Sequence, residues 1–208
     1  MSDARGGFYE RQIMPRLVAA ACATRPVTRK RALLVPRARG EVLELGLGAG
    51  PNLPFYDPKL VIRVRSIEPS DLLRTRAQAF TGPIPVEIQG GMAESLPYPE
   101  ASFDTVVCTF TLCTVHAPAA ALAEAWRVLR PGGRLLYCEH GLAPEPRVAR
   151  WQRRLDPVWS VLAGGCHLTR EPETLLRAAG FAIQSLGSGW LRGTPRFVGW
   201  HTWGHAMR

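Results

Sequence analysis

The sequence predicts an α/β domain with a mostly parallel sheet of seven strands and helices on both of its faces. Two observations lead to this prediction. From Glu41 onward, short apolar segments rich in β-branched residues alternate with segments of helical pattern. A glycine-rich stretch, Gly46 to Gly50, follows the first of these apolar segments directly. Strands separated by helices favour a parallel sheet with right-handed crossovers.

The expected elements can be placed by residue. Strands are expected over residues 41–46, 61–67, 85–89, 103–109, 134–139, 181–186 and 196–202. Helices are expected over residues 70–80, 118–129, 147–162 and 171–179, the last with Thr169 as its N-cap and Gly180 after its end. A turn is expected over residues 130–133, because Pro131 stops the preceding helix and two glycines follow it.

The residues before Glu41 have a different pattern. Residues 6–36 are expected to be helical, and Pro15 and Pro26 divide them into two or three short helices. Apolar side chains recur there near helical spacing at Phe8, Ile13, Leu17, Val18 and Cys22. With 208 residues the chain fits one domain, divided into a helical arm (1–38), a core (40–140), a lid (141–180) and C-terminal strands (181–208).

The positive charge is concentrated in that arm. The chain has a formal net charge of +9, and residues 1–40 contribute nine Arg or Lys against two acidic residues, a balance of +7. A solvated helical face is one interpretation, and peripheral contact with an anionic membrane surface is another. Nucleic acid is not an expected partner, because no basic strand carries the aromatic residues that stack on bases. The oligomeric state stays open.

Composition favours a soluble, cytoplasmic protein. Hydrophobic residues make up 46% and charged residues 21% of the chain. No segment approaches the roughly 20 apolar residues that span a bilayer, and the start of the chain lacks a signal-peptide layout. The five cysteines are scattered, so no disulfide framework is expected.

The glycine-rich stretch has the context of a cofactor loop. Gly46, Gly48 and Gly50 follow a strand, where small residues let the backbone turn tightly and approach a ligand. Dinucleotide-binding proteins use a similar stretch. Two features favour a different nucleoside: Glu44 can hold a cationic amino-acid group through water or backbone, and Pro51-Asn52 replaces the third glycine of a pyrophosphate cradle.

An acidic residue at the end of the second strand supports a nucleoside. Glu68 lies about 20 residues after the loop, where a carboxylate can accept hydrogen bonds from both ribose hydroxyls of an adenosine. Further motifs follow in order along the chain: Gly91-Met-Ala-Glu-Ser-Leu-Pro97, Phe103-Asp-Thr-Val106 and Leu129-Arg-Pro-Gly-Gly133.

In this order the motifs resemble those of the class I S-adenosylmethionine-dependent methyltransferases, from about Gly40 to Glu139. The resemblance implies a Rossmann-like fold with S-adenosyl-L-methionine as cofactor, and adenine held through a backbone amide near Ala93. Met92 departs from the family, many members of which have an aspartate there. The implied cofactor-binding residues are Glu44, Gly46, Gly48, Gly50, Asn52, Glu68, Pro69, Met92, Ala93, Glu94 and Thr109.

The second half of the chain narrows the resemblance. It contains, in order, Val107-Cys-Thr-Phe-Thr-Leu-Cys-Thr-Val115, Glu139-His140, Arg150-Trp-Gln152, Pro157-Val-Trp159 and Gly164-Gly-Cys-His-Leu-Thr-Arg-Glu171. These segments are similar to the methyltransferase-like family of the animal microsomal thiol S-methyltransferases, whose bacterial relatives are described as phospholipid or quinone methyltransferases. The animal members carry an N-terminal apolar anchor that this sequence lacks, so firm membrane residence does not carry over.

The resemblance implies methyl transfer to a small apolar acceptor, a thiol first. Phosphatidylethanolamine N-methylation and quinone C-methylation are alternatives within the class. A protein that binds the nucleoside cofactor without turnover is the alternative outside it. Methyl transfer from a sulfonium is an in-line displacement, so the enzyme mainly needs to hold the nucleophile near the methyl group.

The acceptor pocket is expected at the carboxyl ends of the strands. His140 is the first candidate for a base or orienting group and His167 the second, although either can be a structural histidine. The expected pocket residues are Phe110, Cys113, Trp151, Trp159 and Cys166, with the tryptophans supplying an apolar lining or ordinary core. No metal is expected, because Cys113, His116, Cys138, His140, Cys166 and His167 match no compact ligand motif.

Overall fold

The computed structural model of the protein describes residues 13–208, without the side chains of Ala21, Ser185 and Leu186. One sheet of seven strands runs through the molecule in the order β3-β2-β1-β4-β5-β7-β6. Strand β7 is antiparallel to both of its neighbours, and the other pairs are parallel. The predicted mostly parallel sheet is confirmed. The strands are β1 (Gly40–Leu45), β2 (Val61–Ile67), β3 (Val86–Gln89), β4 (Phe103–Thr109), β5 (Leu129–His140), β6 (Ala182–Trp190) and β7 (Trp200–Met207).

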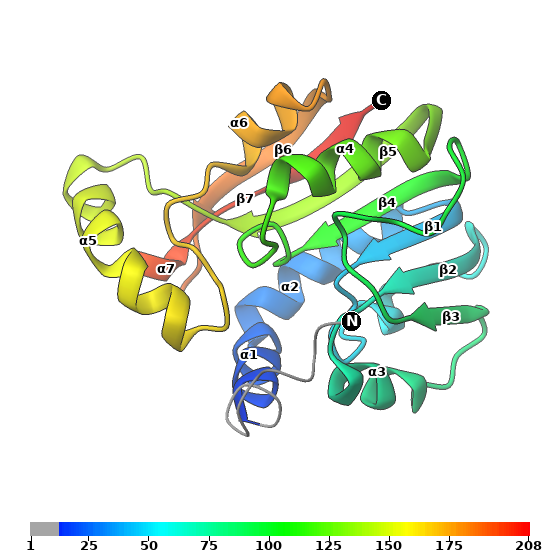
Figure 1. Cartoon of the computed structure of the whole chain (residues 1–208), viewed down its shortest axis with the longest axis horizontal. Coiled ribbons are helices and arrows are strands. Elements are labelled where there is room, and N and C mark those ends of the chain that lie inside the picture. Colours follow the sequence, from blue (N-terminus) through cyan, green and yellow to red (C-terminus); the bar gives the residue numbers. More distant parts are fainter. Residues whose placement is uncertain (1–12) are drawn as a thin grey trace.

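Helices cover both faces of the sheet (Figure 1). They are α1 (Met14–Cys22), α2 (Arg25–Leu34), α3 (Asp71–Gln78), α4 (Pro118–Val128), α5 (Pro146–Leu162), α6 (Pro172–Ala178) and α7 (Arg196–Gly199). Pro15 and Pro26 lie in the first turns of α1 and α2, where the missing backbone N–H costs little. The two prolines therefore start helices, which gives the predicted division of the arm. Phe8 lies outside the described residues.

Alternating side chains of the central strands build two separate cores. Leu43 of β1, Val106 of β4 and Leu135 of β5 belong to one cluster, which also includes buried residues of α4 and α6. Their neighbours Val42 and Val107 belong to a second cluster, which includes the end of α2 and part of α3. A strand buried on both faces is apolar along its whole length, as the sequence of these strands shows. Hydrophobic burial on both faces thus holds the central strands in register.

Three local predictions were wrong. Residues 196–199 form the short helix α7 after Pro195, so β7 starts only at Trp200. The turn at residues 130–133 lies within β5 as a bulge, because Phe103 pairs with Leu129 while Thr105 pairs with Arg134.

Thr169 is the third correction, because it does not cap α6. The N-cap residue of α6 is Glu171, just before Pro172. The carbonyl of Arg170 accepts a hydrogen bond from Leu142 N at 2.9 Å. Residue 170 is therefore still bound to the segment that follows β5, and the helix begins only after it.

Within residues 13–208, no helix combines the length and the apolar character that crossing a membrane requires. The longest helix, α5, has 17 residues and carries four arginines. It follows the carboxyl end of β5 and lies at one end of the molecule (Figure 1).

Candidate active site

A cavity of about 1260 Å³ opens at the carboxyl ends of β1, β2 and β4. The loops that follow these strands form one side of it, and α1 together with the end of α5 forms the other. Small-molecule sites usually measure roughly 300–1000 Å³. The cavity therefore has room for a nucleoside cofactor and a second molecule beside it.

The glycine loop after β1 forms part of the cavity wall. Gly46, Gly48 and Gly50 all have positive φ, at 65°, 59° and 82°. A Cβ atom on Gly46 would lie 2.8 Å from Thr111 Oγ1, whereas one on Gly48 would meet nothing within 4 Å. Gly46 is thus required by packing, and the open side of Gly48 leaves space for a ligand against the backbone.

Glu68 joins this loop to the loop after β2. Its Oε2 accepts a hydrogen bond from Gly48 N at 2.8 Å, and its Oε1 accepts one from Ser70 N at 2.9 Å. Burial raises the pKa of Glu68, although both backbone donors act in the opposite direction. Each carboxylate oxygen keeps a further lone pair, so Glu68 can also accept hydrogen bonds from a ligand in the cavity.

A buried polar network supports the glycine loop from behind. Asn52 Nδ2 donates to Glu44 Oε1 at 2.8 Å and to Thr109 Oγ1 at 3.0 Å. Arg31 of α2 donates to Asn52 Oδ1 and to Thr109 Oγ1, both at 2.7 Å. Tyr56 Oη donates to Glu44 Oε2 at 2.6 Å. The network connects α2, β1 and β4 to the loop.

Both carboxylate oxygens of Glu44 are engaged in this network. Burial raises the pKa of Glu44 to about 7, against the lowering effect of Tyr56, Arg31 and Asn52. Both of its oxygens have partners, and neither Glu44 nor Asn52 is among the described residues that line the cavity. Both residues position the loop, and a hold of Glu44 on the cofactor through water or backbone stays a prediction.

The remaining predicted cofactor residues lie on the cavity wall. Met92 is 40% exposed there, and Glu94 Oε1 accepts a hydrogen bond from Ala117 N at 3.2 Å. The other oxygen of Glu94 is buried without a partner among the described residues. The predicted cofactor residues that line the cavity are Gly46, Gly48, Glu68, Pro69, Met92, Ala93, Glu94 and Thr109.

The opposite side of the cavity is mainly apolar. Helix α1 contributes Met14, Val18, Ala19 and Cys22, and the end of α5 contributes Val161. Phe110 and Val115, from the loop after β4, add further apolar side chains to the lining of the cavity. Phe110, one of the predicted acceptor residues, lines the cavity.

The two tryptophans predicted for this wall lie elsewhere. Trp151 is 59% exposed on α5, because the adjacent Gln152 anchors the helix through hydrogen bonds to Ala143 N, Gly141 O and Phe197 O. Trp159 packs edge-on against Phe197, with ring centroids 5.4 Å apart. Neither is among the described residues that line this cavity, and their place in an acceptor pocket stays a prediction.

The two predicted histidines are engaged within the protein. His140 Nε2 lies 2.9 Å from Cys166 Sγ, and the side chain is buried. Burial lowers the pKa of His140, but the hydrogen bond to Cys166 and the nearby Glu139 raise it overall. His167 Nδ1 lies 2.9 Å from Asp156 Oδ2. Neither histidine lines the cavity, and a role for them as base remains a prediction.

Residues that sequence reasoning did not assign to the site also contribute to it. His116 and Cys22 line the cavity. Arg31 and Tyr56 belong to the network behind the loop. The sequence offered a weak signal for His116, which closely follows the predicted strand 103–109. The sequence offered no signal for Arg31, because nothing in it distinguishes Arg31 from the neighbouring basic residues of the arm.

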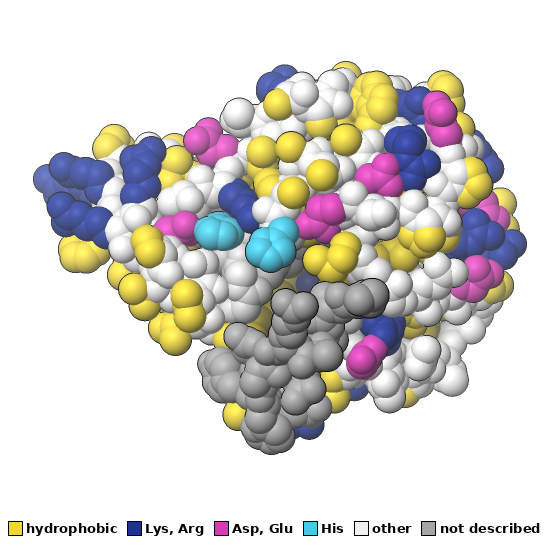
Figure 2. Space-filling model, in the orientation of Figure 1, with side chains coloured by type: hydrophobic (Ala, Val, Ile, Leu, Met, Phe, Trp, Pro, Cys, Tyr) yellow, Lys and Arg dark blue, Asp and Glu magenta, His cyan; other side chains and the backbone are white. Residues whose placement is uncertain are grey.

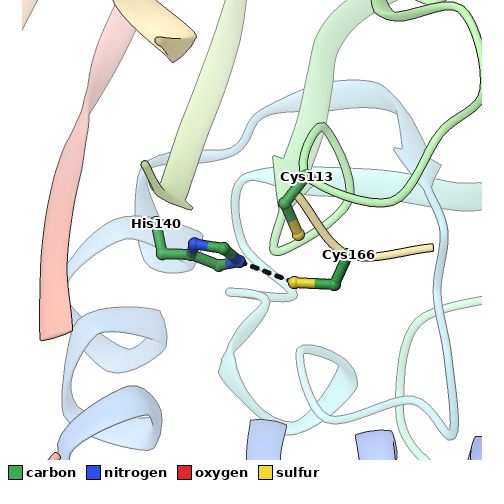
Figure 3. Close-up of side chains that lie close together, drawn as sticks. All are labelled: Cys113, His140 and Cys166. Atoms are coloured by element: carbon green, nitrogen blue, oxygen red, sulfur yellow. Dashed lines mark hydrogen bonds between the residues drawn. The ribbon is translucent and has the colours of Figure 1, made fainter. Parts of the chain in front are cut away.

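Three of the scattered sulfur and imidazole side chains come together beside this site. Cys113 from the loop after β4, His140 at the end of β5 and Cys166 after α5 point toward one another (Figure 3). Their ligand atoms all lie within 4.8 Å of one another. The cluster was not predicted, because its members are far apart in the sequence and no local spacing indicates it.

Comparison with known proteins agrees with this geometry. Residues 43–137 match the family model described as a methyltransferase domain. A structure of an S-adenosylmethionine-dependent methyltransferase from Thermotoga maritima, described as a possible histamine N-methyltransferase, superimposes with a TM-score of 0.65. The superposition covers 93% of this chain and 97% of that one at 23% identity, which shows a shared fold. Residues 43–137 thus correspond to a methyltransferase domain, within the fold that the chain shares with this S-adenosylmethionine-dependent methyltransferase.

Curated relatives of this methyltransferase domain act on different acceptors. Thiol S-methyltransferase TMT1B of Rattus norvegicus is 38% identical over 62% of this chain and 55% of its own length. Demethylmenaquinone methyltransferase of Deinococcus radiodurans is 37% identical over 47% of this chain and 42% of its own length. Phosphatidylethanolamine N-methyltransferase of Cereibacter sphaeroides is 33% identical over 54% of this chain and 56% of its own length. The chain thus spans about half the length of these relatives, and the family uses S-adenosyl-L-methionine as methyl donor.

Proposed function

We propose that this chain transfers the methyl group of S-adenosyl-L-methionine to the sulfur of a small apolar thiol. The observation that carries the proposal is the two-sided cavity. Glu68 and the open backbone at Gly48 offer polar groups to a nucleoside, and the opposite wall offers α1 and the end of α5 to an apolar molecule. Burying apolar surface stabilises such a complex by roughly 25 cal/mol per Å². The 38% identity to a thiol S-methyltransferase supports sulfur as the acceptor atom.

The residues of the chain act mainly by positioning. When bound, the sulfonium of the cofactor would supply a methyl carbon that a thiolate attacks in line, with S-adenosylhomocysteine as the leaving group. Glu68 and the glycine loop orient the nucleoside, and Phe110 and Val18 confine the acceptor next to it. Fixing two reactants in one cavity lowers the barrier because little translational entropy remains to be lost.

The acceptor has to lose a proton before it attacks. A free thiol has a pKa of about 8.5, so roughly a tenth of it is thiolate near pH 7.5. His116 lines the cavity and can accept this proton, whereas His140 and His167 are occupied by Cys166 and Asp156. We therefore assign the first proton acceptor to His116.

An acceptor panel tests the proposal. Purified full chain is incubated with S-adenosyl-L-methionine and an apolar thiol, a charged thiol, a quinol or phosphatidylethanolamine vesicles, and methylated products are measured by mass spectrometry. We expect the apolar thiol to have a kcat/KM at least tenfold above that of the charged thiol. Transfer to the quinol or the phospholipid without any thioether would reject the proposal. Cofactor binding without transfer to any acceptor would favour the non-catalytic binding protein.

Two neighbouring residues of α1 give a matched pair of variants. Val18 lines the cavity, whereas Leu17 is 54% exposed and is not part of its wall. Val18→Asp places a charge in the acceptor wall and should raise the KM for the apolar thiol about tenfold, equivalent to about 1.4 kcal/mol. Leu17→Asp should leave this KM unchanged. Equal effects of the two variants would contradict an acceptor site at α1.

Peripheral contact with an anionic membrane surface is proposed for α5. Two basic residues of the N-terminal arm face the protein: Arg31 is buried in the network and Lys30 Nζ lies 3.0 Å from the centroid of the Trp203 ring. Contact through the N-terminal arm stays a prediction, and exposed basic and apolar side chains also lie together on α5, at the left end of the molecule in Figure 2. They are Arg147, Arg150, Trp151, Arg153, Arg154, Val158, Val161 and Leu162. An arginine-rich helix with an exposed tryptophan is typical of interfacial binding.

Vesicle sedimentation tests this contact. We expect the chain to bind vesicles with anionic lipid and not vesicles of zwitterionic lipid alone, since each Arg contributes about 1 kcal/mol near an anionic surface. Arg150→Glu with Arg153→Glu should abolish binding, while Arg76→Glu on the exposed side of α3 should have little effect. Binding that is insensitive to lipid charge would contradict the proposal.

A further inference from the structure

The cluster of Cys113, His140 and Cys166 has the composition of a metal site. Two thiols and one imidazole are the ligands that zinc takes in proteins, and three protein ligands leave a fourth position open. The three residues come from three different elements, yet their ligand atoms all lie within 4.8 Å of one another (Figure 3). Cys113 and His140 are buried, and Cys166 is partly exposed.

The dimensions of the cluster fit one ion. Zinc bonds sulfur at about 2.3 Å and imidazole nitrogen at about 2.0 Å, so two ligand atoms of a tetrahedral site lie roughly 3.5–3.8 Å apart. In the protein His140 Nε2 and Cys166 Sγ are 2.9 Å apart, and no pair in the cluster exceeds 4.8 Å. Side-chain movements of about 1 Å therefore bring all three atoms to bonding distance of one ion.

Hydrogen bonds outside the cluster hold its backbone in place. His167 N donates to the carbonyl oxygen of Cys113 at 2.8 Å, and Arg170 donates to the carbonyl oxygen of Leu112. The side chain of Asp156 binds His167 and the backbone N–H of Leu168. These bonds fasten the segment of Cys166 to the loop of Cys113, as the outer partners of a metal site do.

The cluster borders the cavity. Thr114 and Gly165, the sequence neighbours of two cluster residues, both line it, and so does Cys22. Cys166, the partly exposed residue of the cluster, directly follows Gly165 in the sequence. The side of the cluster toward these residues is therefore the side from which a molecule in the cavity can approach.

We propose that Cys113, His140 and Cys166 bind one zinc ion, whose fourth coordination position takes the sulfur of the acceptor thiol. The second part of this proposal rests on the proposed function. In the binding step the sulfur forms a bond to zinc and the thiol releases its proton to His116, so no oxidant or reductant is needed. A thiol bound in this way is deprotonated near neutral pH, because coordination stabilises the thiolate. After methylation the sulfur is a neutral thioether, a weaker ligand that can leave.

Zinc titration of the full chain tests the first part. Metal-free reduced chain is titrated with zinc against a chromophoric chelator. We expect one zinc per chain, and at least a hundredfold lower affinity for Cys113→Ser, Cys166→Ser and His140→Gln. Cys138→Ala is the matched control, because Cys138 is a fully buried thiol of β5 that belongs to the second core cluster. Zinc affinity that is the same in the Cys113→Ser/Cys166→Ser double variant as in the unmodified chain would overturn the site.

Cobalt(II) substitution tests the second part without relying on turnover or on the folding of a variant. The unmodified chain with cobalt should show thiolate-to-cobalt charge transfer, and an apolar thiol should shift the d–d bands of the ion. The corresponding methyl thioether should shift them much less. A spectrum that does not respond to the thiol would overturn the open fourth position.

The two proposals can fail separately. Thiol methylation by a chain that binds no zinc would reject the zinc site and leave the proposed function intact. A zinc site that responds to thiols, in a chain that methylates only phosphatidylethanolamine or a quinol, would reject the proposed function and leave the metal site intact.

Discussion

The two sides of the cavity are built in different ways. On the cofactor side, loops after parallel strands are fixed by short hydrogen bonds, with Glu68 holding Gly48 and Ser70 and with Arg31, Asn52 and Glu44 behind them. On the acceptor side, the wall comes from α1 and the end of α5, which pack at the rim of the sheet. A shared cofactor requires a fixed set of donors and acceptors, whereas an apolar acceptor requires only shape and apolar surface. Under the proposed function, this difference fits a family whose curated relatives are named for a thiol, a quinone and a phospholipid acceptor.

The largest effect is expected on the cofactor side, from Glu68→Ala. The variant loses the acceptor for Gly48 N, for Ser70 N and for ligand hydroxyls. Hydrogen bonds to a charged group contribute about 1.5–3 kcal/mol each. Calorimetry with S-adenosyl-L-methionine should show an affinity at least a hundredfold lower. Glu100→Ala, at an exposed carboxylate, is the control. Unchanged cofactor affinity in Glu68→Ala would contradict the assignment of this side of the cavity to the cofactor.

Alanine substitutions at two glycines of one loop should affect the stability of the chain and its affinity for the cofactor to different extents. Gly46→Ala forces a Cβ to 2.8 Å from Thr111 Oγ1 at positive φ, so its free energy of unfolding should fall by about 3 kcal/mol. Gly48→Ala has the same backbone cost of about 1 kcal/mol but no clash, and its Cβ adds bulk at a position that lines the cavity. Gly48→Ala should therefore lose cofactor affinity with a smaller loss of stability. Denaturant unfolding and calorimetry measure the two effects, and the reverse pattern would contradict the geometry of the loop.

A smaller effect is expected from the pH dependence of the network behind the loop. The pKa of Glu44 is raised from 4.5 to about 7 in the folded chain, mainly by burial. Between these values the folded chain binds the proton and the unfolded chain does not. The stabilising contribution is thus complete below pH 4.5 and is lost as the pH rises through 7.

Comparison with Glu44→Gln isolates this effect. The free energy of unfolding of the unmodified chain should fall by about 2 kcal/mol more than that of Glu44→Gln between about pH 5 and pH 8. The carboxyl of Glu139, whose pKa burial also raises, is present in both proteins and cancels in the difference. Parallel stability curves for the two proteins would show that Glu44 does not titrate in this range.

The smallest effect is expected from Trp151→Ala on the acceptor side. Its indole is exposed on α5 and is not part of the cavity wall, so kcat/KM for a water-soluble apolar thiol should change less than twofold. Phe110→Ala, which removes a ring from the wall, should raise the KM for the same thiol several-fold. A large effect of Trp151→Ala in the absence of vesicles would place the acceptor next to Trp151 and outside this cavity.

The difference between the cofactor side and the acceptor side of the cavity also explains which structural features could be predicted from the sequence. Short continuous apolar segments predicted β1 and β4 to within one residue, together with the second half of β5, because these strands are buried on both faces. Gly48 and Glu68 were predictable because short loops after neighbouring parallel strands lie together at one edge of the sheet. The roles of Glu44 and Asn52 were not, because their position behind the loop depends on Arg31, Tyr56 and Thr109 from other parts of the chain.

On the acceptor side, prediction from sequence was weaker for a physical reason. Trp151 was expected in the pocket from its residue type, but Gln152 decides which face of α5 packs inward. Cys113, His140 and Cys166 meet only through the tertiary fold. Local patterns predict elements and loops, whereas contacts between distant loops require the packed structure.

Transfer of an isotopically labelled methyl group tests the central claim most directly. Full chain is supplied with methyl-labelled S-adenosyl-L-methionine and with an apolar thiol, a quinol and phosphatidylethanolamine in competition. We predict one labelled thioether for each S-adenosylhomocysteine formed, with loss of this product in Glu68→Ala. Label that appears on the nitrogen of the phospholipid or on a ring carbon of the quinol, with no labelled thioether, would contradict the account.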